Sequence, residues 1–293
     1  MLKTLFSIIA TLPNRFAQQL GTGVGILLYY FSRREKGVAR INIALCFPEL
    51  SAKQQRHLVK KTLIENSKTL LEMPRIFKCG GDYAIRLIQA VTGMEHYHKA
   101  IADGKGVIII APHLGNWELV IHYLNQFSPI TAMFAPPKQA FLHAIMQTGR
   151  QSSGATLVPA DSSGVRAQLK HLKQGGVIGI LPDQNPKHGH AGVFAPFMGN
   201  DAYTMLLINS LAQRTNAAVI MSFAERLADG SGYRLHILPA PDGIDDKDKI
   251  VAASSLNQAV EQCLRIAPAQ YQWTYKRFKY QPEGKVSPYR ILD

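Results

Sequence analysis

The sequence predicts an α/β fold with a mostly parallel central sheet flanked by helices, preceded by a hydrophobic N-terminal helix. Short apolar runs of strand length alternate with helical segments, which is the pattern of a parallel sheet covered on both faces. With 293 residues and 46% hydrophobic content, the chain can bury the core of one large domain. No linker long enough to divide the chain is evident. We therefore separate only an N-terminal segment, 1–31, from a main domain, 32–293.

The segment 1–31 is expected to anchor the chain to a membrane as a hydrophobic helix. Its two apolar runs, 1–12 and 20–31, are each shorter than the ~20 residues that cross a bilayer. No small-residue cleavage site follows them, which argues against a removed secretory signal. A basic cluster follows, of the kind that favours the cytoplasmic side and anionic lipid headgroups: Arg33, Arg34, Lys36 and Arg40. The alternative interpretation is a buried amphipathic helix.

The main domain is predicted to begin with helices and to continue with alternating strands and helices. Ser51 and Gln54 have the spacing of a capping box, so a long helix is expected to start there and to end or kink at Pro74. A second helical stretch is expected over 83–103, with a possible break at Gly93. Six runs rich in β-branched residues are then predicted as strands: 107–111, 130–134, 155–158, 177–181, 217–223 and 233–238.

The composition predicts a polyanionic partner. The 33 basic and 20 acidic residues give a formal charge of +13, which suits nucleic acid, an anionic membrane or a phosphorylated substrate. Aromatic and basic residues interleave over 273–280, as at a membrane interface or, alternatively, where nucleic-acid bases stack. No nucleic-acid-binding motif is recognisable, so nucleic acid is not the expected partner. Three scattered cysteines exclude a disulfide framework, and no metal site is predicted.

His113 is the strongest candidate for chemistry. It follows the predicted strand 107–111, at the edge of a parallel sheet where ligands bind, and precedes a helix that we expect Asn116 to cap. The amino terminus of a helix favours a neutral imidazole and an ionised Glu118. We therefore expect His113 to act as a general base and Glu118 to orient its ring. The spacing alone is weak support, because His98 and Asp103 share it.

Other catalytic motifs are absent from the sequence. It contains no Gly-x-Ser-x-Gly elbow, no His-Glu-x-x-His helix and no phosphate-binding Gly-x4-Gly-Lys loop. The simplest chemistry for a His–Glu pair is then direct transfer without an acylated enzyme residue. The histidine deprotonates an acceptor hydroxyl, which attacks an activated acyl carbonyl.

The loop Ala111-Pro-His-Leu-Gly-Asn-Trp-Glu118 resembles the His-x4-Glu loop of the lysophospholipid acyltransferase superfamily. Its setting is similar to that of the lipid A late acyltransferases, which transfer lauroyl or myristoyl chains. Five further blocks contribute to the similarity: 40–48, Gly149-Arg150, Leu181-Pro-Asp-Gln184, 197–204 and 271–279.

The resemblance implies a glycerolipid acyltransferase-like fold at the cytoplasmic face of the inner membrane. The donor would be an acyl chain on acyl carrier protein, with no other cofactor. The acceptor would be the hydroxyl of a 3-hydroxyacyl chain on a phosphorylated, Kdo-bearing lipid A precursor. Another glycolipid or a lysophospholipid is the alternative acceptor.

The resemblance also implies roles for individual residues. His113 and Glu118 carry over as base and partner, while Arg150 and Asp183 match blocks that help to bind the acceptor. Arginine suits a phosphate because its planar fork donates two hydrogen bonds. The alternative roles are a surface ion pair for Arg150 and a turn-forming role for Asp183. Further substrate-binding residues are expected in the same loops: Gly115, Asn116 and Lys187.

Overall fold

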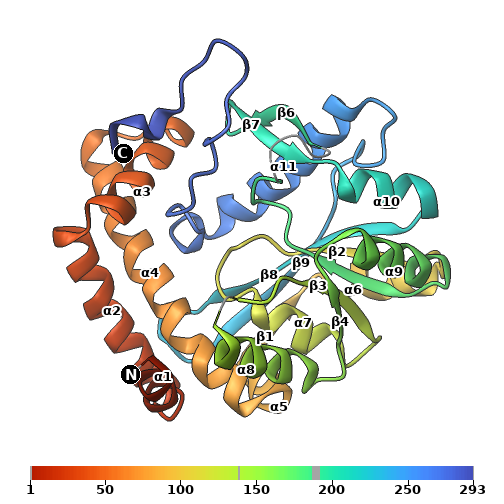
Figure 1. The fold of residues 1–293 in the computed structure, drawn as a ribbon, viewed down its shortest axis with the longest axis horizontal. Coiled ribbons are helices and arrows are strands. Elements are labelled where there is room, and N and C mark those ends of the chain that lie inside the picture. Colours follow the sequence, from red (N-terminus) through yellow and green to blue (C-terminus); the bar gives the residue numbers. More distant parts are fainter. Residues whose placement is uncertain (1, 138, 187–191, 293) are drawn as a thin grey trace.

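The computed structural model of the chain describes residues 2–137, 139–186 and 192–292. Within these residues, seven strands form one sheet in the order β1-β9-β8-β2-β5-β3-β4, and β6 and β7 form a separate antiparallel hairpin (Figure 1). Neighbours in the large sheet are parallel except β8 and β9. The strands are β1 (Ile88–Thr92), β2 (Val107–Ile110), β3 (Ile130–Phe134), β4 (Thr156–Pro159), β5 (Val177–Ile180), β6 (Gly192–Phe197), β7 (Asn200–Met205), β8 (Ala218–Arg226) and β9 (Tyr233–Pro239).

Helices cover both faces of this sheet. On β2, Ile108 and Ile110 pack in one core cluster with Leu256, and Val107 and Ile109 pack in another that includes α7. The continuous apolar run of this strand is therefore buried on both faces. The helices are α1 (Leu2–Ile9), α2 (Asn14–Phe31), α3 (Arg33–Cys46), α4 (Ala52–Cys79), α5 (Gly81–Arg86), α6 (Met94–Ala102), α7 (Glu118–Leu124), α8 (Ala140–Gln151), α9 (Ser162–Lys173), α10 (Leu207–Thr215) and α11 (Lys249–Ile266), with 3₁₀ turns Pro268–Gln270 and Pro288–Leu292.

The predicted α/β class and the six predicted strands are confirmed, as β2, β3, β4, β5, β8 and β9. The prediction of helix across 83–103 is wrong in its middle, where Ile88–Thr92 forms the edge strand β1, parallel to β9. Pairing with β9 overrides the weak helical pattern of this short β-branched run. The expected break at Gly93 is confirmed, with φ +77°. The β6–β7 hairpin was not predicted.

The long helix α4 begins as the sequence predicts but ends later. The side chain of Ser51 accepts from the Gln54 N–H, and that of Gln54 accepts from the Ser51 N–H, so the capping box is confirmed. The helix runs through Pro74 to Cys79, so of the two expectations for Pro74, an end or a kink, the end is wrong. Burial of Ile76 and Phe77 stabilises the turn beyond the proline and offsets the missing backbone hydrogen bond.

The N-terminal helices α1 and α2 lie along α4 (Figure 1). A Cβ on Gly21 would lie 2.6 Å from the Lys68 Cα and one on Gly25 would lie 2.4 Å from the Ile64 Cα, so these glycines let the helices pack backbone to backbone. Across the described residues, none of the helices combines the length and the apolar content needed to traverse a bilayer. Large apolar side chains nevertheless stay exposed on α1 and α2: Leu5, Ile8, Phe16, Leu20, Leu27, Tyr30 and Phe31.

The aromatic and basic stretch near the C-terminus contributes largely to the core. Trp273, Arg277 and Phe278 are all buried. The Arg277 guanidinium donates to the Tyr203 carbonyl (2.7 Å) and to the Asn185 side chain (2.9 Å). These three side chains therefore do not form the membrane-interface surface that the mixture of aromatic and basic residues suggested.

Candidate active site

His113 lies on the loop between β2, the central strand of the sheet, and α7. Backbone hydrogen bonds fix this loop, because the N–H groups of Gly115 and Asn116 donate to the carbonyls of Gln270 (3.1 Å) and Ala224 (3.0 Å). Gly115 has φ +63°, and a Cβ there would lie 1.9 Å from the Ala224 carbonyl oxygen. The turn therefore requires glycine, and it holds the imidazole at a fixed place on the sheet edge.

The carboxylate that contacts the His113 ring is that of Asp183. Asp183 follows β5, the neighbour of β2, and its Oδ1 lies 2.8 Å from His113 Nδ1 while its Oδ2 accepts from the His113 backbone N–H at 2.9 Å. Burial alone would raise the pKa of Asp183, but attraction to His113 and these hydrogen bonds outweigh it, and the pKa is lowered. An ionised Asp183 can only accept, so Nδ1 is the nitrogen that carries a proton toward it, and Nε2 is the ring nitrogen left to act as the base.

Gln184 lies against that second ring nitrogen. Its Nε2 is 3.2 Å from His113 Nε2 and 3.4 Å from the Gln272 Oε1, to which it donates. Gln272 in turn donates its backbone N–H to the His113 carbonyl at 3.0 Å. The amide of Gln184 therefore occupies the position from which a hydroxyl would reach the base.

Glu118 pairs with Arg150. The Glu118 carboxylate, on the first turn of α7, accepts from Arg150 Nε at 2.8 Å and from its Nη2 at 2.5 Å, and Arg150 comes from the last turn of α8. Burial would raise the pKa of Glu118, but the attraction and hydrogen bonds of Arg150 lower it overall. The structure records no hydrogen bond or ion pair between His113 and Glu118, both of which it describes. The expected partner of the base therefore contacts the expected phosphate ligand instead.

Asn116 is held by a buried network behind the loop and does not cap α7 with its side chain. Its Nδ2 lies 3.5 Å from Glu72 Oε2 and 3.4 Å from the Tyr233 hydroxyl. The expectation of an N-cap is wrong because a buried carboxylate competes for the side-chain amide and the Asn116 backbone carbonyl accepts from the Leu119 N–H instead.

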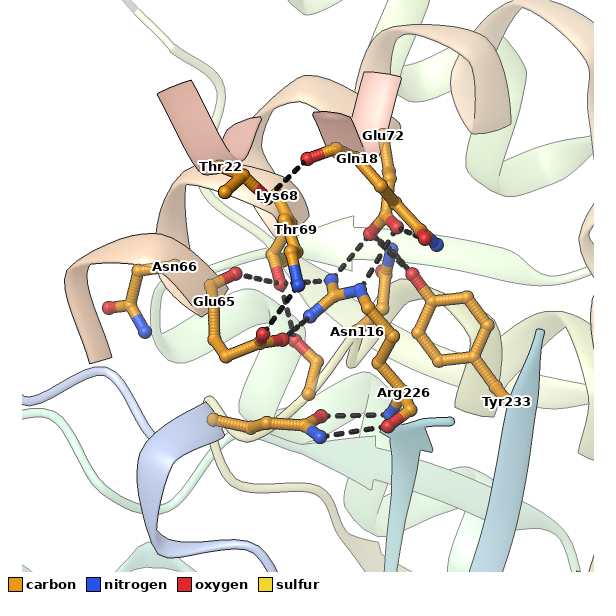
Figure 2. A network of polar contacts seen from close by, with 12 residues as sticks. Gln18, Thr22, Glu65, Asn66, Lys68, Thr69, Glu72, Asn116, Arg226 and Tyr233 are labelled. Atoms are coloured by element: carbon orange, nitrogen blue, oxygen red, sulfur yellow. Dashed lines mark hydrogen bonds and ion pairs between the residues drawn. The ribbon is translucent and has the colours of Figure 1, made fainter. Parts of the chain in front are cut away.

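Arg226 is the centre of that network (Figure 2). It lies at the end of β8 and donates to the carboxylates of Glu72 (2.5 and 3.0 Å) and Glu65 (2.6 Å) on α4. It also donates to the Thr69 hydroxyl at 2.7 Å, and Thr69 donates to the Gly115 carbonyl at 3.0 Å. The network thus ties α4 to the His113 loop, and Gln18 of α2 joins it through a 2.9 Å bond to Glu72.

Two cavities meet at Trp117, whose ring centroid is 4.8 Å from that of His113. The first, of about 370 Å³, is lined by apolar side chains of β2, β3, β5, α7 and α8, and Glu118 and Arg150 are its charged residues. The second, of about 260 Å³, is lined by His113, the 270–274 segment and residues of α2 and α4. Trp117 lines both cavities and so stands between them.

Comparison with known proteins shows the family. Residues 2–280 match the family model for bacterial lipid A biosynthesis acyltransferases. The chain belongs to this family. It is 29% identical over 284 residues to the lipid A biosynthesis lauroyltransferase of Escherichia coli K12. The aligned region covers 96% of the chain and 91% of that protein. It is 29% identical to the palmitoleoyltransferase (92% and 87% covered) and 25% identical to the myristoyltransferase (97% and 88%) of the same strain.

This lipid A acyltransferase family confirms the resemblance drawn from the sequence and identifies the chain as an acyltransferase with a glycolipid acceptor. It favours an enzyme over the nucleic-acid-binding alternative. Lys187, expected to bind substrate, lies outside the described residues. The structure groups His113, Gly115 and Asp183 at one place, and Glu118 and Arg150 beside them.

Sequence reasoning did not assign roles to several residues around the base. Gln184 belongs to the Leu181-Pro-Asp-Gln184 block, so its position was marked, but nothing indicated that it faces the imidazole. Glu72 and Arg226 contact each other but lie 154 positions apart in the chain, so no local pattern indicated this pair. Gln270 and Gln272 were not marked either, because their partners are distant in the chain. The Gln270 side chain exchanges two hydrogen bonds with the Arg226 backbone, and Gln272 contacts His113 and Gln184.

Proposed function

We propose that this acyltransferase moves a fatty acyl chain of the lauroyl or myristoyl class from acyl carrier protein to a hydroxyl of a Kdo-bearing lipid A precursor, with His113 as the general base. The observation that carries this proposal is the pairing of His113 with Asp183, where His113 lines one cavity and its neighbour Trp117 lines that cavity and the apolar one. Asp183 replaces Glu118 as the residue that orients the ring. No acylated enzyme residue and no metal takes part.

The reaction proceeds by direct attack. His113 Nε2 takes the proton of the acceptor hydroxyl, and the oxygen attacks the carbonyl carbon of the acyl thioester. The C–S bond then breaks as the ester forms, and the imidazolium returns the proton to the departing thiolate. Asp183 stabilises the imidazolium in between. The amide of Gln184 moves aside when the acceptor binds, because it lies 3.2 Å from Nε2.

The 370 Å³ cavity suits the acyl chain. Its walls are almost entirely apolar, and burial of a hydrocarbon chain there contributes about 0.8 kcal/mol for each methylene. The thioester carbonyl then lies beside Trp117, within reach of the base. The 260 Å³ cavity, which His113 lines, suits the acceptor chain that carries the hydroxyl.

Glu118 has a positioning role in this proposal. Its ion pair with Arg150 joins the start of α7 to the end of α8 and thereby fixes the His113 loop from the side of the acyl cavity. Gly115 holds the same loop through Gln270, and Asn116 holds it through Ala224 and Glu72. Lys187 is proposed to contact the acceptor headgroup.

Contact with an anionic inner membrane, at its cytoplasmic face, completes the proposal. The exposed apolar side chains of α1 and α2 are accompanied by Arg15, Arg33 and Arg34, all on the surface. Apolar residues bordered by cations bind anionic bilayers in the plane of the interface.

Mass spectrometry tests the function directly. Lipids from cells with and without the protein should differ by one acyl increment on a lipid A precursor, and purified protein should restore it from acyl-acyl carrier protein. His113→Ala should abolish the increment. An unchanged lipid A with an altered lysophospholipid or other glycolipid would assign a different acceptor, and normal transfer by a folded His113→Ala protein would refute the mechanism.

A further inference from the structure

A basic groove runs along the N-terminal half of α4. It has a volume of about 1080 Å³ and is bordered by α2, by the start of α4 and by the turn 267–270. Lys53, Arg56 and Lys60 recur at intervals of three and four residues on one face of the helix, and the adjacent Lys61 also lines the groove. Lys53, Arg56 and Lys61 are exposed and Lys60 is half-buried.

The charge of the groove is positive and largely uncompensated. Two carboxylates line it, Glu49 and Glu225, and Glu225 already contacts His236 at 2.8 Å. None of the four cations forms an ion pair with any residue in the described part of the chain. Four like charges within about two turns repel one another, and a bound anion would relieve that repulsion.

The groove adjoins the cavity that His113 lines. Gln270 lines both the groove and the 260 Å³ cavity, in which His113 lies. The apolar 370 Å³ cavity shares no lining residue with the groove, and His113 does not line it. A molecule that occupies the groove therefore approaches His113 from the side of the acceptor and away from the acyl chain of the donor.

We propose that this α4 groove binds the phosphate groups of the acceptor headgroup while the hydroxyl-bearing chain of the same molecule enters the 260 Å³ cavity. The proposal rests on the proposed function and adds the site for the anionic part of the substrate. Tyr29 and Tyr30, which also line the groove, offer ring faces and hydroxyls to the sugar. The acidic acyl carrier protein is the weaker candidate for this surface, because its acyl chain belongs on the other side of Trp117.

Charge reversal tests the groove. The variant Lys53→Glu/Arg56→Glu/Lys60→Glu/Lys61→Glu is compared with the wild-type protein in detergent micelles, with a phosphorylated lipid A precursor and with the same lipid after phosphatase treatment. Each contact between exposed charges is individually weak, but the variant removes four of them together. The KM for the phosphorylated lipid is therefore expected to rise roughly tenfold or more. The KM for the dephosphorylated lipid and for the acyl donor should change less than twofold.

The matched control reverses four exposed lysines far from the groove. Lys99→Glu/Lys105→Glu/Lys170→Glu/Lys173→Glu makes the same charge change on α6, α9 and the loop after α6, at the right of Figure 1, whereas α4 lies at the left. It should leave the KM for both lipids unchanged. Lys53→Arg/Lys60→Arg/Lys61→Arg keeps the charge and should retain the wild-type KM.

Each alternative outcome overturns the groove proposal in a recognisable way. A higher KM for the acyl donor alone would assign the groove to the carrier protein. Loss of binding to vesicles containing 30% anionic lipid, with both lipid KM values unchanged in micelles, would assign it to the membrane. Because direct binding of the phosphorylated lipid, measured by isothermal titration calorimetry, needs no turnover, it distinguishes failure of the groove from failure of the proposed activity. If the fourfold variant does not fold, Arg56→Gln and Lys60→Gln give the same comparison singly.

Discussion

Two buried carboxylates flank the His113 loop, and they differ in what they hold. Asp183 contacts the imidazole through Oδ1 and the loop backbone through Oδ2, whereas Glu118 is occupied by the guanidinium of Arg150. Both pKa values are lowered against the opposing effect of burial, one by a histidine and the other by a permanent cation. A carboxylate near a base is therefore not necessarily its partner, because a neighbouring arginine can bind it instead, as Arg150 binds Glu118.

The largest expected effect separates the two carboxylates by activity. Asp183→Asn should lower kcat about 10³ to 10⁴-fold, because the ring loses the acceptor that fixes its tautomer and stabilises the imidazolium. Glu118→Gln should lower kcat about 10 to 100-fold, since it acts only through the position of the loop. Single-turnover transfer by folded protein measures both. A greater loss in Glu118→Gln would reverse the assignment.

The second comparison concerns stability. Glu118→Gln leaves the buried Arg150 charge without its partner and should lower the free energy of unfolding by about 3 to 5 kcal/mol. The double variant Glu118→Gln/Arg150→Met should recover much of this loss, because neither charge is then buried alone. Urea unfolding monitored by circular dichroism provides both values. Asp161→Asn, an exposed helix cap that asparagine replaces well, is the control and should unfold like the wild type.

The pH dependence of stability extends this comparison. Because Asp183 and Glu118 have lower pKa values in the folded protein than their ordinary 3.8 and 4.5, the unfolded chain binds more protons as the pH falls. Their contribution is thus fully present above the ordinary values and is lost as the pH falls through the lowered ones. Urea unfolding between pH 6 and 3 should show a shallower decline in Asp183→Asn than in the wild type. Equal slopes would mean that folding does not lower the pKa of Asp183.

The smallest expected effect concerns Gln184. In Gln184→Glu, a carboxylate beside Nε2 would stabilise the imidazolium, so the acid limb of the pH profile for kcat/KM should move up by about one pH unit. Gln184→Met, which has a similar length and no charge, should leave the limb in place. An unmoved limb in Gln184→Glu would indicate that this side chain does not face the base during turnover.

Much of this arrangement could be predicted where the signal is local. The buried strands, the capping box at Ser51 and the place of His113 at the sheet edge all follow from runs of neighbouring residues. The pairing of His113 with Asp183 does not, because the two are 70 positions apart and only the adjacency of β2 and β5 brings them together. Asp183 was located correctly at that edge, but a sequence cannot show which of two nearby cations a carboxylate contacts. The edge strand β1 was missed for a similar reason, since its partner β9 is distant in the chain.

The place of Trp117 between the two cavities has a consequence for the order of events. If each cavity accepts one substrate, neither molecule has to leave before the other arrives, and both are present in a ternary complex when the ester forms. Initial rates measured at several fixed donor concentrations would then give intersecting lines in double-reciprocal plots, and parallel lines would point to a covalent intermediate. The two cavities on either side of the Trp117 indole would in this way lead to sequential kinetics.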